Sequence, residues 1–273
     1  MVRSFKDTGF LVLDEFCTPQ ECAELQAGAR QVMRGADAEA ATIFSTDGAE
    51  HQSDRYFLES GDKIRYFFEQ DAFLPDGSLR GDPEVCLNKL GHAMHDLDPV
   101  FERFSYKPEL GHIARALGQS RPSIVQSMYI LKPPRIGGEV HCHQDSTYIY
   151  TDPDSCLGFW FAVEDATTEN GCMYFLPGEH KGPLRERNHR TGPFSTTTTV
   201  LDDRPWRLEE AVPVEAPIGS LVVFHGRAPH FSGPNRSTRS RHAYTLHVID
   251  QACEYPADNW LQRGPELPLR PLI

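Results

Sequence analysis

The sequence predicts an α+β fold in which N-terminal helices precede an antiparallel β-barrel or jelly roll. Patterns typical of helices are confined to the chain before Ile124, and short strand-like runs separated by Pro, Gly and Asn-Gly follow it. The composition, with 39% hydrophobic and 24% charged residues over 273 positions, is that of a globular protein with a full core. No internal repeat or linker interrupts the chain, so residues 1–273 are predicted to form a single domain.

The N-terminal segment predicts a strand followed by a capped helix. Residues 9–16, Gly-Phe-Leu-Val-Leu-Asp-Glu-Phe, have the apolar content of a short strand. Thr18-Pro19-Gln20-Glu21 is a capping box with Pro at the first helical position. We therefore expect a helix from this box to about Met33.

Less regular segments follow this helix. Residues 36–55 are polar and aperiodic, and we expect a loop or mobile lid over the substrate side of the barrel mouth. Two apolar runs around the turn signal Ser60-Gly61-Asp62-Lys63 predict a hairpin over residues 56–68. A helix is expected from Pro83 to about His95, and another over residues 108–117. The helix that Pro83 opens would carry Asn88, Lys89, His92 and His95.

Short apolar runs in the second half of the chain predict the strands of the barrel. They are bounded by turn residues, and few helical patterns lie between them, which favours antiparallel pairing. The predicted strands cover residues 124–131, 143–150, 156–164, 172–176, 212–216, 220–225 and 241–249.

Charge and cysteine content narrow the class of partner. With 27 Lys and Arg against 39 Asp and Glu, the net charge is −12, and no basic block is present, which argues against nucleic acid or a membrane as partner. No apolar run approaches the ~20 residues of a membrane span, and the N-terminus does not resemble a secretory signal. The 7 cysteines form no C-x-x-C pair and are typical of reduced thiols. A cytoplasmic protein acting on a small molecule is expected.

The densest group of metal-binding residue types is the segment His141-Cys142-His143-Gln144-Asp145. On a strand, His143 and Asp145 point to the same face, where an imidazole and a carboxylate can bind one divalent metal. Two His and one carboxylate leave three octahedral positions open, which suits Fe(II) with a chelating cosubstrate and O₂. The third ligand must come from elsewhere in the chain. The downstream candidates are His180, His189, His225, His230, His242 and His247.

Arg241 lies eleven residues after His230, at the start of a predicted strand. On that strand Arg241, Ala243, Thr245 and His247 share one face. If this face lines the barrel, the buried guanidinium needs a carboxylate partner, and a bidentate clamp is the physical reason for placing an Arg there.

These motifs together resemble the phytanoyl-CoA dioxygenase family of Fe(II)/2-oxoglutarate oxygenases. The resemblance rests on the H-x-D pair, a distal His and an Arg eleven residues later. It extends to Asn170-Gly171 followed by Pro177-Gly178-Glu179-His180, where Glu179 replaces a usual Ser, and it covers nearly the whole chain. It implies a double-stranded β-helix, which is a jelly roll, with N-terminal helices.

The resemblance implies that His143, Asp145 and His230 are the iron ligands. His225 competes for the third position, because Arg236 also follows it by eleven residues. We favour His230, because the Ser and Asn that follow it are similar to those of the family. His141 and Cys142 offer alternative ligands next to the H-x-D pair.

The resemblance also implies the cosubstrate and the reaction. An Fe(II)-dependent hydroxylase of this kind uses O₂ and 2-oxoglutarate, releases succinate and CO₂, and is supported by ascorbate. Asp145 favours hydroxylation over halogenation, since halogenating relatives replace this carboxylate with a small residue. The substrate would be a small molecule or an acyl compound. The implied contacts with 2-oxoglutarate are Lys89, Met128, Trp160, Ser232 and Arg241.

Two other functions fit parts of the pattern. One is a metal-binding β-barrel enzyme that does not use 2-oxoglutarate, and the other is a non-catalytic binding module. Arg241 argues against the first, because such an enzyme needs no buried carboxylate clamp. The intact set of two His and one Asp argues against the second.

Overall fold

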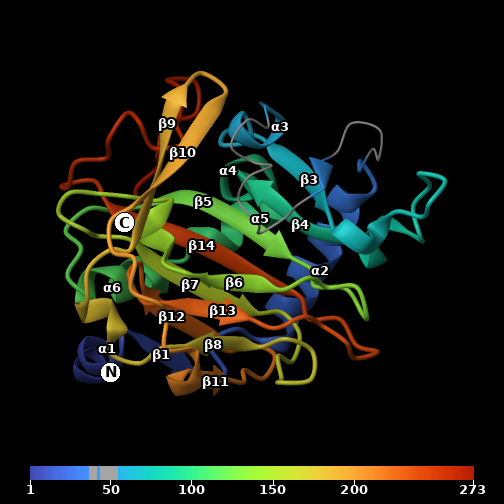
Figure 1. The fold of residues 1–273 in the computed structure, drawn as a ribbon, viewed down its shortest axis with the longest axis horizontal. Helices are drawn as coiled ribbons and strands as arrows, with labels where there is room; N and C mark the ends of the chain where they lie inside the picture. Colours follow the sequence, from blue (N-terminus) through green and yellow to red (C-terminus); the bar gives the residue numbers. More distant parts are fainter. Residues whose placement is uncertain (37–41, 44–54) are drawn as a thin grey trace.

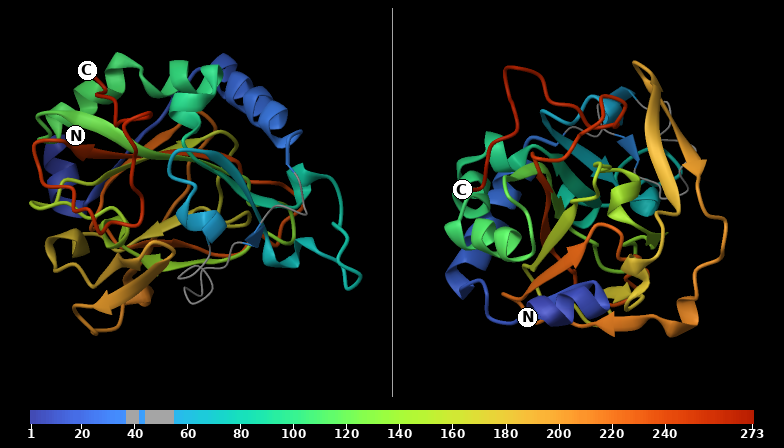
Figure 2. Two further views of the ribbon diagram at one scale, coloured as in Figure 1. Left: turned by 90° about the horizontal axis from the view of Figure 1, so that it is seen from above. Right: turned by 90° about the vertical axis from the view of Figure 1, so that its left-hand side faces the viewer.

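The computed structural model describes residues 1–36, 42–43 and 55–273, which form two facing β-sheets, a separate two-stranded hairpin, and helices that cover the outer face of the larger sheet (Figures 1 and 2). The helices are α1 (Val2–Thr8), α2 (Pro19–Met33), α3 (Arg55–Leu58), α4 (Met94–Leu97), α5 (Pro99–Ser105) and α6 (Pro108–Ala116). The strands are β1 (Phe10–Leu13), β2 (Thr42–Ile43), β3 (Ile64–Phe68), β4 (Leu87–His92), β5 (Pro122–Ile130), β6 (Val140–His143), β7 (Leu157–Ala162), β8 (Met173–Phe175), β9 (Glu186–Gly192), β10 (Ser195–Val200), β11 (Val212–Val214), β12 (Leu221–His225), β13 (His230–Ser232) and β14 (Ala243–Asp250).

The strand order is that of a jelly roll. In the described residues the larger sheet has 8 strands, β1-β12-β7-β14-β5-β4-β3-β2, and the smaller has 4, β11-β8-β13-β6. All pairs are antiparallel except β2 with β3, and β9 and β10 form a separate hairpin that projects at one end of the barrel (Figure 1). The predicted α+β class and the double-stranded β-helix are confirmed.

The large sheet buries a different core on each face. Toward the small sheet, Trp160, Val222 and Ala243 pack against Met173 and Phe175. On the opposite face, alternate residues of the same strands pack against α2, α5 and α6, which cover the sheet in Figure 2. This alternation leaves the space between the two sheets available for a site.

The predicted helix from the capping box is confirmed as α2. The Thr18 hydroxyl accepts from the Glu21 amide, and the Glu21 carboxylate accepts from the Thr18 amide at 2.8 Å. The helix predicted over residues 108–117 is present as α6. Both helices are determined by local signals, namely a cap or Pro at the start and an apolar face turned to the sheet.

The helix predicted from Pro83 to His95 is wrong. Pro83–Val85 forms only a 3-10 turn, and the chain then enters β4, which pairs with β3 on one side and β5 on the other. Pairing on both edges outweighs the helical signal of Pro83, because it satisfies the backbone of the whole strand. Lys89 and His92 therefore lie on a strand, and His95 lies on α4.

Other boundaries differ as well. The hairpin predicted over residues 56–68 is wrong, since α3 precedes the turn and β3 pairs with β4 instead. The strand predicted over 143–150 is wrong, since β6 covers Val140–His143 and a 3-10 turn, Asp145–Thr147, follows it. The lid predicted over 36–55 falls almost entirely outside the described residues. None of the described helices has the length and apolar character needed to cross a bilayer.

Candidate metal centre

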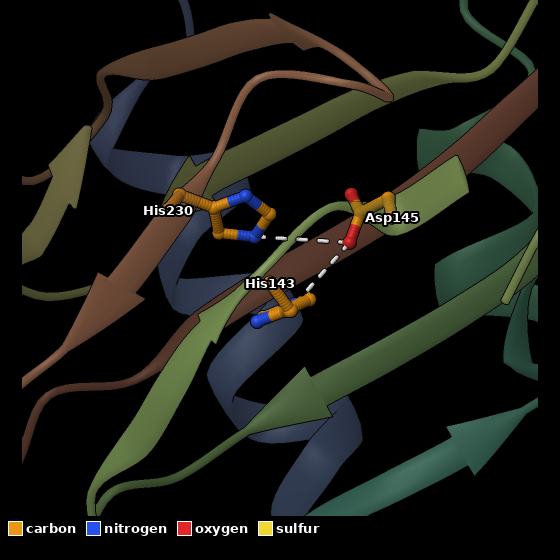
Figure 3. A group of neighbouring side chains, drawn as sticks. All are labelled: His143, Asp145 and His230. Atoms are coloured by element: carbon orange, nitrogen blue, oxygen red, sulfur yellow. Dashed lines mark ion pairs between the residues drawn. The ribbon is translucent and has the colours of Figure 1, made fainter. Parts of the chain in front are cut away.

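Three side chains converge between the sheets (Figure 3). One nitrogen each of His143 and His230 and one carboxylate oxygen of Asp145 all lie within 4.8 Å of one another. The Nε2 atoms of His143 and His230 are 3.5 and 3.7 Å from Oδ1 of Asp145. A single divalent ion placed among these atoms would contact all three.

Strand pairing places the two histidines opposite each other. β6 and β13 are antiparallel neighbours in the small sheet, and His143 and His230 are directly paired in their register. Asp145 comes from the 3-10 turn after β6, so the carboxylate reaches the histidines by a change of backbone direction and not along a continuous strand. The turn brings it into the barrel, where only 6% of the residue is exposed.

Hydrogen bonds orient both imidazoles toward the centre. The Nδ1 atom of His143 lies 2.8 Å from the His141 carbonyl, and that of His230 lies 3.0 Å from the Ala228 carbonyl. A carbonyl only accepts, so each Nδ1 carries the proton and each Nε2 presents a lone pair to the centre. This is the tautomer that a metal ligand requires.

The charge state of the centre also suits a cation. Burial and the neighbouring His143 lower the pKa of His230 to about 4, so its imidazole is neutral. Burial by itself would raise the pKa of Asp145, but His247, His230 and His143 outweigh it and hold that pKa well below its ordinary value. Burial by itself would lower the pKa of His143, but the hydrogen bond and the charge of Asp145 outweigh it and raise that pKa, so a bound cation would take the place of the proton on Nε2. Two imidazoles without that proton and one ionised carboxylate would be a donor set that fits Fe(II).

The other histidine candidates lie elsewhere. His225 is 5.5 Å from the His180 ring and accepts from the Arg227 amide through Nδ1, away from the centre. His189 lies on the β9–β10 hairpin, and His242 contacts the Tyr129 hydroxyl. The structure therefore brings His230, and not His225, to His143 and Asp145, and their role as iron ligands stays a prediction.

Arg241 lies just before β14 and not on the strand where the sequence predicted it, but it is beside Trp160 on the side of the large sheet that faces the small sheet. It is 2% exposed, and its guanidinium carbon lies 5.4 Å from the centre of the Trp160 ring. Within the described chain, its Nε and Nη1 atoms have no hydrogen-bond partner. Burial lowers its pKa to about 10, so it stays protonated near neutral pH. A buried cation with unpaired donors fits a ligand carboxylate.

The other predicted cosubstrate contacts border the same interior. Trp160, Thr245 and Met128 are cross-strand neighbours on β7, β14 and β5. Lys89 is buried on β4, with its Nζ 5.5 Å from the Phe67 ring, and burial lowers its pKa to about 7. Because Lys89 lies on a strand and not on a helix, its side chain is buried inside the barrel.

Sequence reasoning missed a second buried lysine. Lys132 is 2% exposed, and its Nζ donates to the Gly138 carbonyl at 2.7 Å and to the Ser232 hydroxyl at 3.0 Å. Burial and the nearby Arg241 lower its pKa to about 7. Its sequence context, Lys-Pro-Pro after a strand, has the form of an exposed turn and contains no signal of burial.

A buried glutamate was also missed, and a candidate histidine has a different role from the one considered. Glu69 is 3% exposed, accepts from the Asn88 side chain at 3.0 Å, and has a pKa that burial raises. His247, which the sequence offered only as a possible ligand, contacts Asp145 instead, with its Nε2 2.9 Å from Oδ2. The Asn88 contact depends on the pairing of β3 with β4, and the Asp145 contact joins residues 102 positions apart, so no local motif indicates either one.

The structure also places Glu179, which departs from the family pattern, and Cys142, which the sequence offered as an alternative ligand. Glu179, where Ser is usual, forms ion pairs with Arg207 and Arg185. Arg185 in turn stacks 4.0 Å from the centre of the Trp206 ring, beside a cavity of about 270 Å³ that His143 also borders. Cys142 lies outside the three-residue group, and burial raises its pKa to about 12, so it stays a thiol.

Comparisons with known proteins agree with this geometry. The sequence profile of the phytanoyl-CoA dioxygenase (PhyH) family matches residues 5–243. Phytanoyl-CoA dioxygenase of Arabidopsis thaliana is 41% identical over 264 residues, covering 95% of this chain and 92% of the relative. Phytanoyl-CoA dioxygenase domain-containing protein 1 of Bos taurus is 43% identical over 282 residues, covering 99% and 97%.

Solved structures show the same fold at lower identity. The epimerase SnoN, in complex with Fe3+, alpha ketoglutarate and nogalamycin RO, has a TM-score of 0.68 at 18% identity, covering 99% of this chain and 91% of SnoN. EctD from S. alaskensis, with 2-oxoglutarate and 5-hydroxyectoine, has a TM-score of 0.60 at 18% identity, covering 97% and 87%.

Proposed function

Because this chain belongs to the phytanoyl-CoA dioxygenase family and is a 2-oxoglutarate-dependent dioxygenase, we propose that it hydroxylates a C–H bond of a small-molecule or acyl substrate. The reaction would consume O₂ and 2-oxoglutarate and release succinate and CO₂, with one oxygen atom in the hydroxylated product and the other in succinate. His143, Asp145 and His230 would bind the iron.

The buried guanidinium of Arg241 is the observation that carries this proposal. An unpaired cation in the barrel interior is costly unless an anion joins it, and a carboxylate of 2-oxoglutarate matches the geometry of the guanidinium fork. A metal enzyme without this cosubstrate has no use for such a group. A binding module would need neither Arg241 nor the three converging ligands.

The residues around Arg241 would complete the cosubstrate site. Since Lys132 donates to the oxygen of Ser232, the Ser232 proton is available to donate to a carboxylate. Lys89 would supply a further cation, and Met128 and Trp160 would exclude water. When bound, the iron and 2-oxoglutarate supply the oxidising chemistry, and the protein supplies the binding groups and the dry interior. The carboxylate of Asp145 leaves no room for a halide at the metal and so supports hydroxylation.

Succinate formation tests the proposal. The purified protein would be incubated with Fe(II), ascorbate, 2-oxoglutarate and a panel of metabolites that includes acyl compounds. We expect succinate to form, to increase with a true substrate, and to fall to background in His143→Ala. Absence of succinate under all conditions from a folded protein that binds iron would contradict the proposal.

A further inference from the structure

We infer that His247 is a positioning residue that makes Asp145 bind the metal through one oxygen only. The inference rests on the proposed function and extends it to a residue outside the three ligands. The two carboxylate oxygens of Asp145 have different surroundings. Oδ1 faces the Nε2 atoms of His143 and His230, at 3.5 and 3.7 Å, while Oδ2 lies 2.9 Å from Nε2 of His247.

The hydrogen bond from His247 has a defined direction. A carboxylate that binds a cation is ionised and can only accept, so Nε2 of His247 carries the proton and donates to Oδ2. Nδ1 of His247 is buried and has no hydrogen-bond partner among the described residues. The contact with Asp145 is therefore the one polar contact that the structure records for this imidazole.

The strand that carries His247 holds it firmly in place. His247 lies on β14, between Gln126 of β5 and Gly158 of β7, and it is 6% exposed. Asp145 follows β6 of the facing sheet. The hydrogen bond thus joins the two sheets across the interior and prevents the carboxylate from rotating about its Cβ–Cγ bond. Arg241 lies just before β14, so this strand and the residues that lead into it would serve both the metal and the cosubstrate.

Binding through one oxygen has a consequence for the open positions of the metal. Three ligand atoms leave three positions of an octahedron for the chelating cosubstrate and O₂. If Asp145 turned to bind through both oxygens, it would occupy a fourth position and compete with 2-oxoglutarate. Loss of His247 should therefore weaken cosubstrate binding. It should also weaken metal binding, because a carboxylate that is free to rotate is no longer held with Oδ1 facing the two histidines.

The test compares two substitutions of His247 in the full chain. His247→Leu removes the donor and keeps an apolar side chain, whereas His247→Gln places an amide nitrogen near the position of Nε2. Co(II) affinity and the Co(II) absorption spectrum would be measured without O₂, and 2-oxoglutarate affinity would then be measured on the Co(II) form. We expect His247→Leu to weaken Co(II) binding by on the order of 10- to 100-fold and to change the spectrum, as loss of outer hydrogen bonds does at other metal sites. His247→Gln should restore most of the affinity and the native spectrum.

A matched control separates positioning from packing. His95 is another fully buried imidazole, whose Nδ1 contacts the Ser127 hydroxyl at 2.7 Å outside the centre. His95→Leu should lower the unfolding temperature without changing Co(II) affinity. Unchanged Co(II) binding and spectrum in His247→Leu, or equal losses in the Leu and Gln variants, would overturn the inference. Those outcomes leave succinate formation by the native protein intact, so failure of this inference and failure of the proposed function are distinguishable.

Discussion

Replacing Arg241 with Met should separate cosubstrate binding from stability. The change removes a guanidinium that is 2% exposed and fills most of its volume with an apolar chain. In the complex it would leave a 2-oxoglutarate carboxylate without its buried partner, and breaking such a charge pair costs about 2–5 kcal/mol. At 1.4 kcal/mol per tenfold change, the dissociation constant of 2-oxoglutarate should rise by roughly 30- to 4,000-fold.

The stability of the ligand-free protein should not fall with this substitution, although its affinity for 2-oxoglutarate does. Without ligand, Nε and Nη1 of Arg241 have no hydrogen-bond partner among the described residues. Removing unsatisfied buried donors should therefore leave the free energy of unfolding unchanged or raise it by about 1–3 kcal/mol. Ordinary core damage would lower it.

Calorimetric titration of the Co(II) form with 2-oxoglutarate measures the dissociation constant. Urea unfolding of the metal-free protein measures the free energy of unfolding. Arg239→Met is the matched control, because Arg239 is exposed in the same segment of chain. It should bind 2-oxoglutarate with native affinity. Native affinity in Arg241→Met, or a metal-free protein that is strongly destabilised by this change, would refute the reasoning.

Three other predictions concern the same interior. His230→Ala should abolish tight Co(II) binding while His225→Ala retains it; the reverse result would identify His225 as the ligand. Lys132→Met should weaken 2-oxoglutarate binding by on the order of 10- to 100-fold, because a hydrogen bond involving a charged group contributes about 1.5–3 kcal/mol, and native affinity in this variant would remove Lys132 from the site. Burial lowers the pKa of both Lys89 and Lys132 to about 7, so 2-oxoglutarate affinity should fall as the pH rises above 7 and these cations are lost. Since the unfolded chain keeps these protons up to about pH 10, stability of the metal-free protein should rise over the same range, which urea unfolding at several pH values would check.

Local signals in the sequence were sufficient for several elements. The Thr18 capping box places the start of α2, because its hydrogen bonds involve only residues three apart. Apolar runs bounded by turn residues predicted β5, β7, β8, β11, β12 and β14, whereas the short or polar strands β6, β9, β10 and β13 were not predicted. The failure at β4 has the opposite cause: Leu87–His92 is a strand because β3 and β5 flank it, and both partners are distant in the chain.

The candidate metal centre, too, was predicted from the sequence only in part. The residue types of His143, Asp145 and His230 and their motif context are visible in the sequence, because the chemistry of a metal ligand restricts the choice of side chain. The strand prediction that put His143 and Asp145 on one continuous face was only partly right, since the strand ends at His143 and Asp145 reaches the centre from a 3-10 turn.

The sequence by itself therefore determined the fold class, the family and the residue types of the candidate ligands, because these follow from composition and from motifs that are visible without knowing which strands pair. Only the tertiary structure decided that His225 points away, that Lys132 supports Ser232 and that His247 donates to Asp145. The last two contacts join residues 100 and 102 positions apart. Their formation depends on which strands pair, on the register of each pair and on the face each side chain occupies. Those properties belong to the packed sheets as a whole, because a shift of one residue in any strand would turn its side chains to the opposite face.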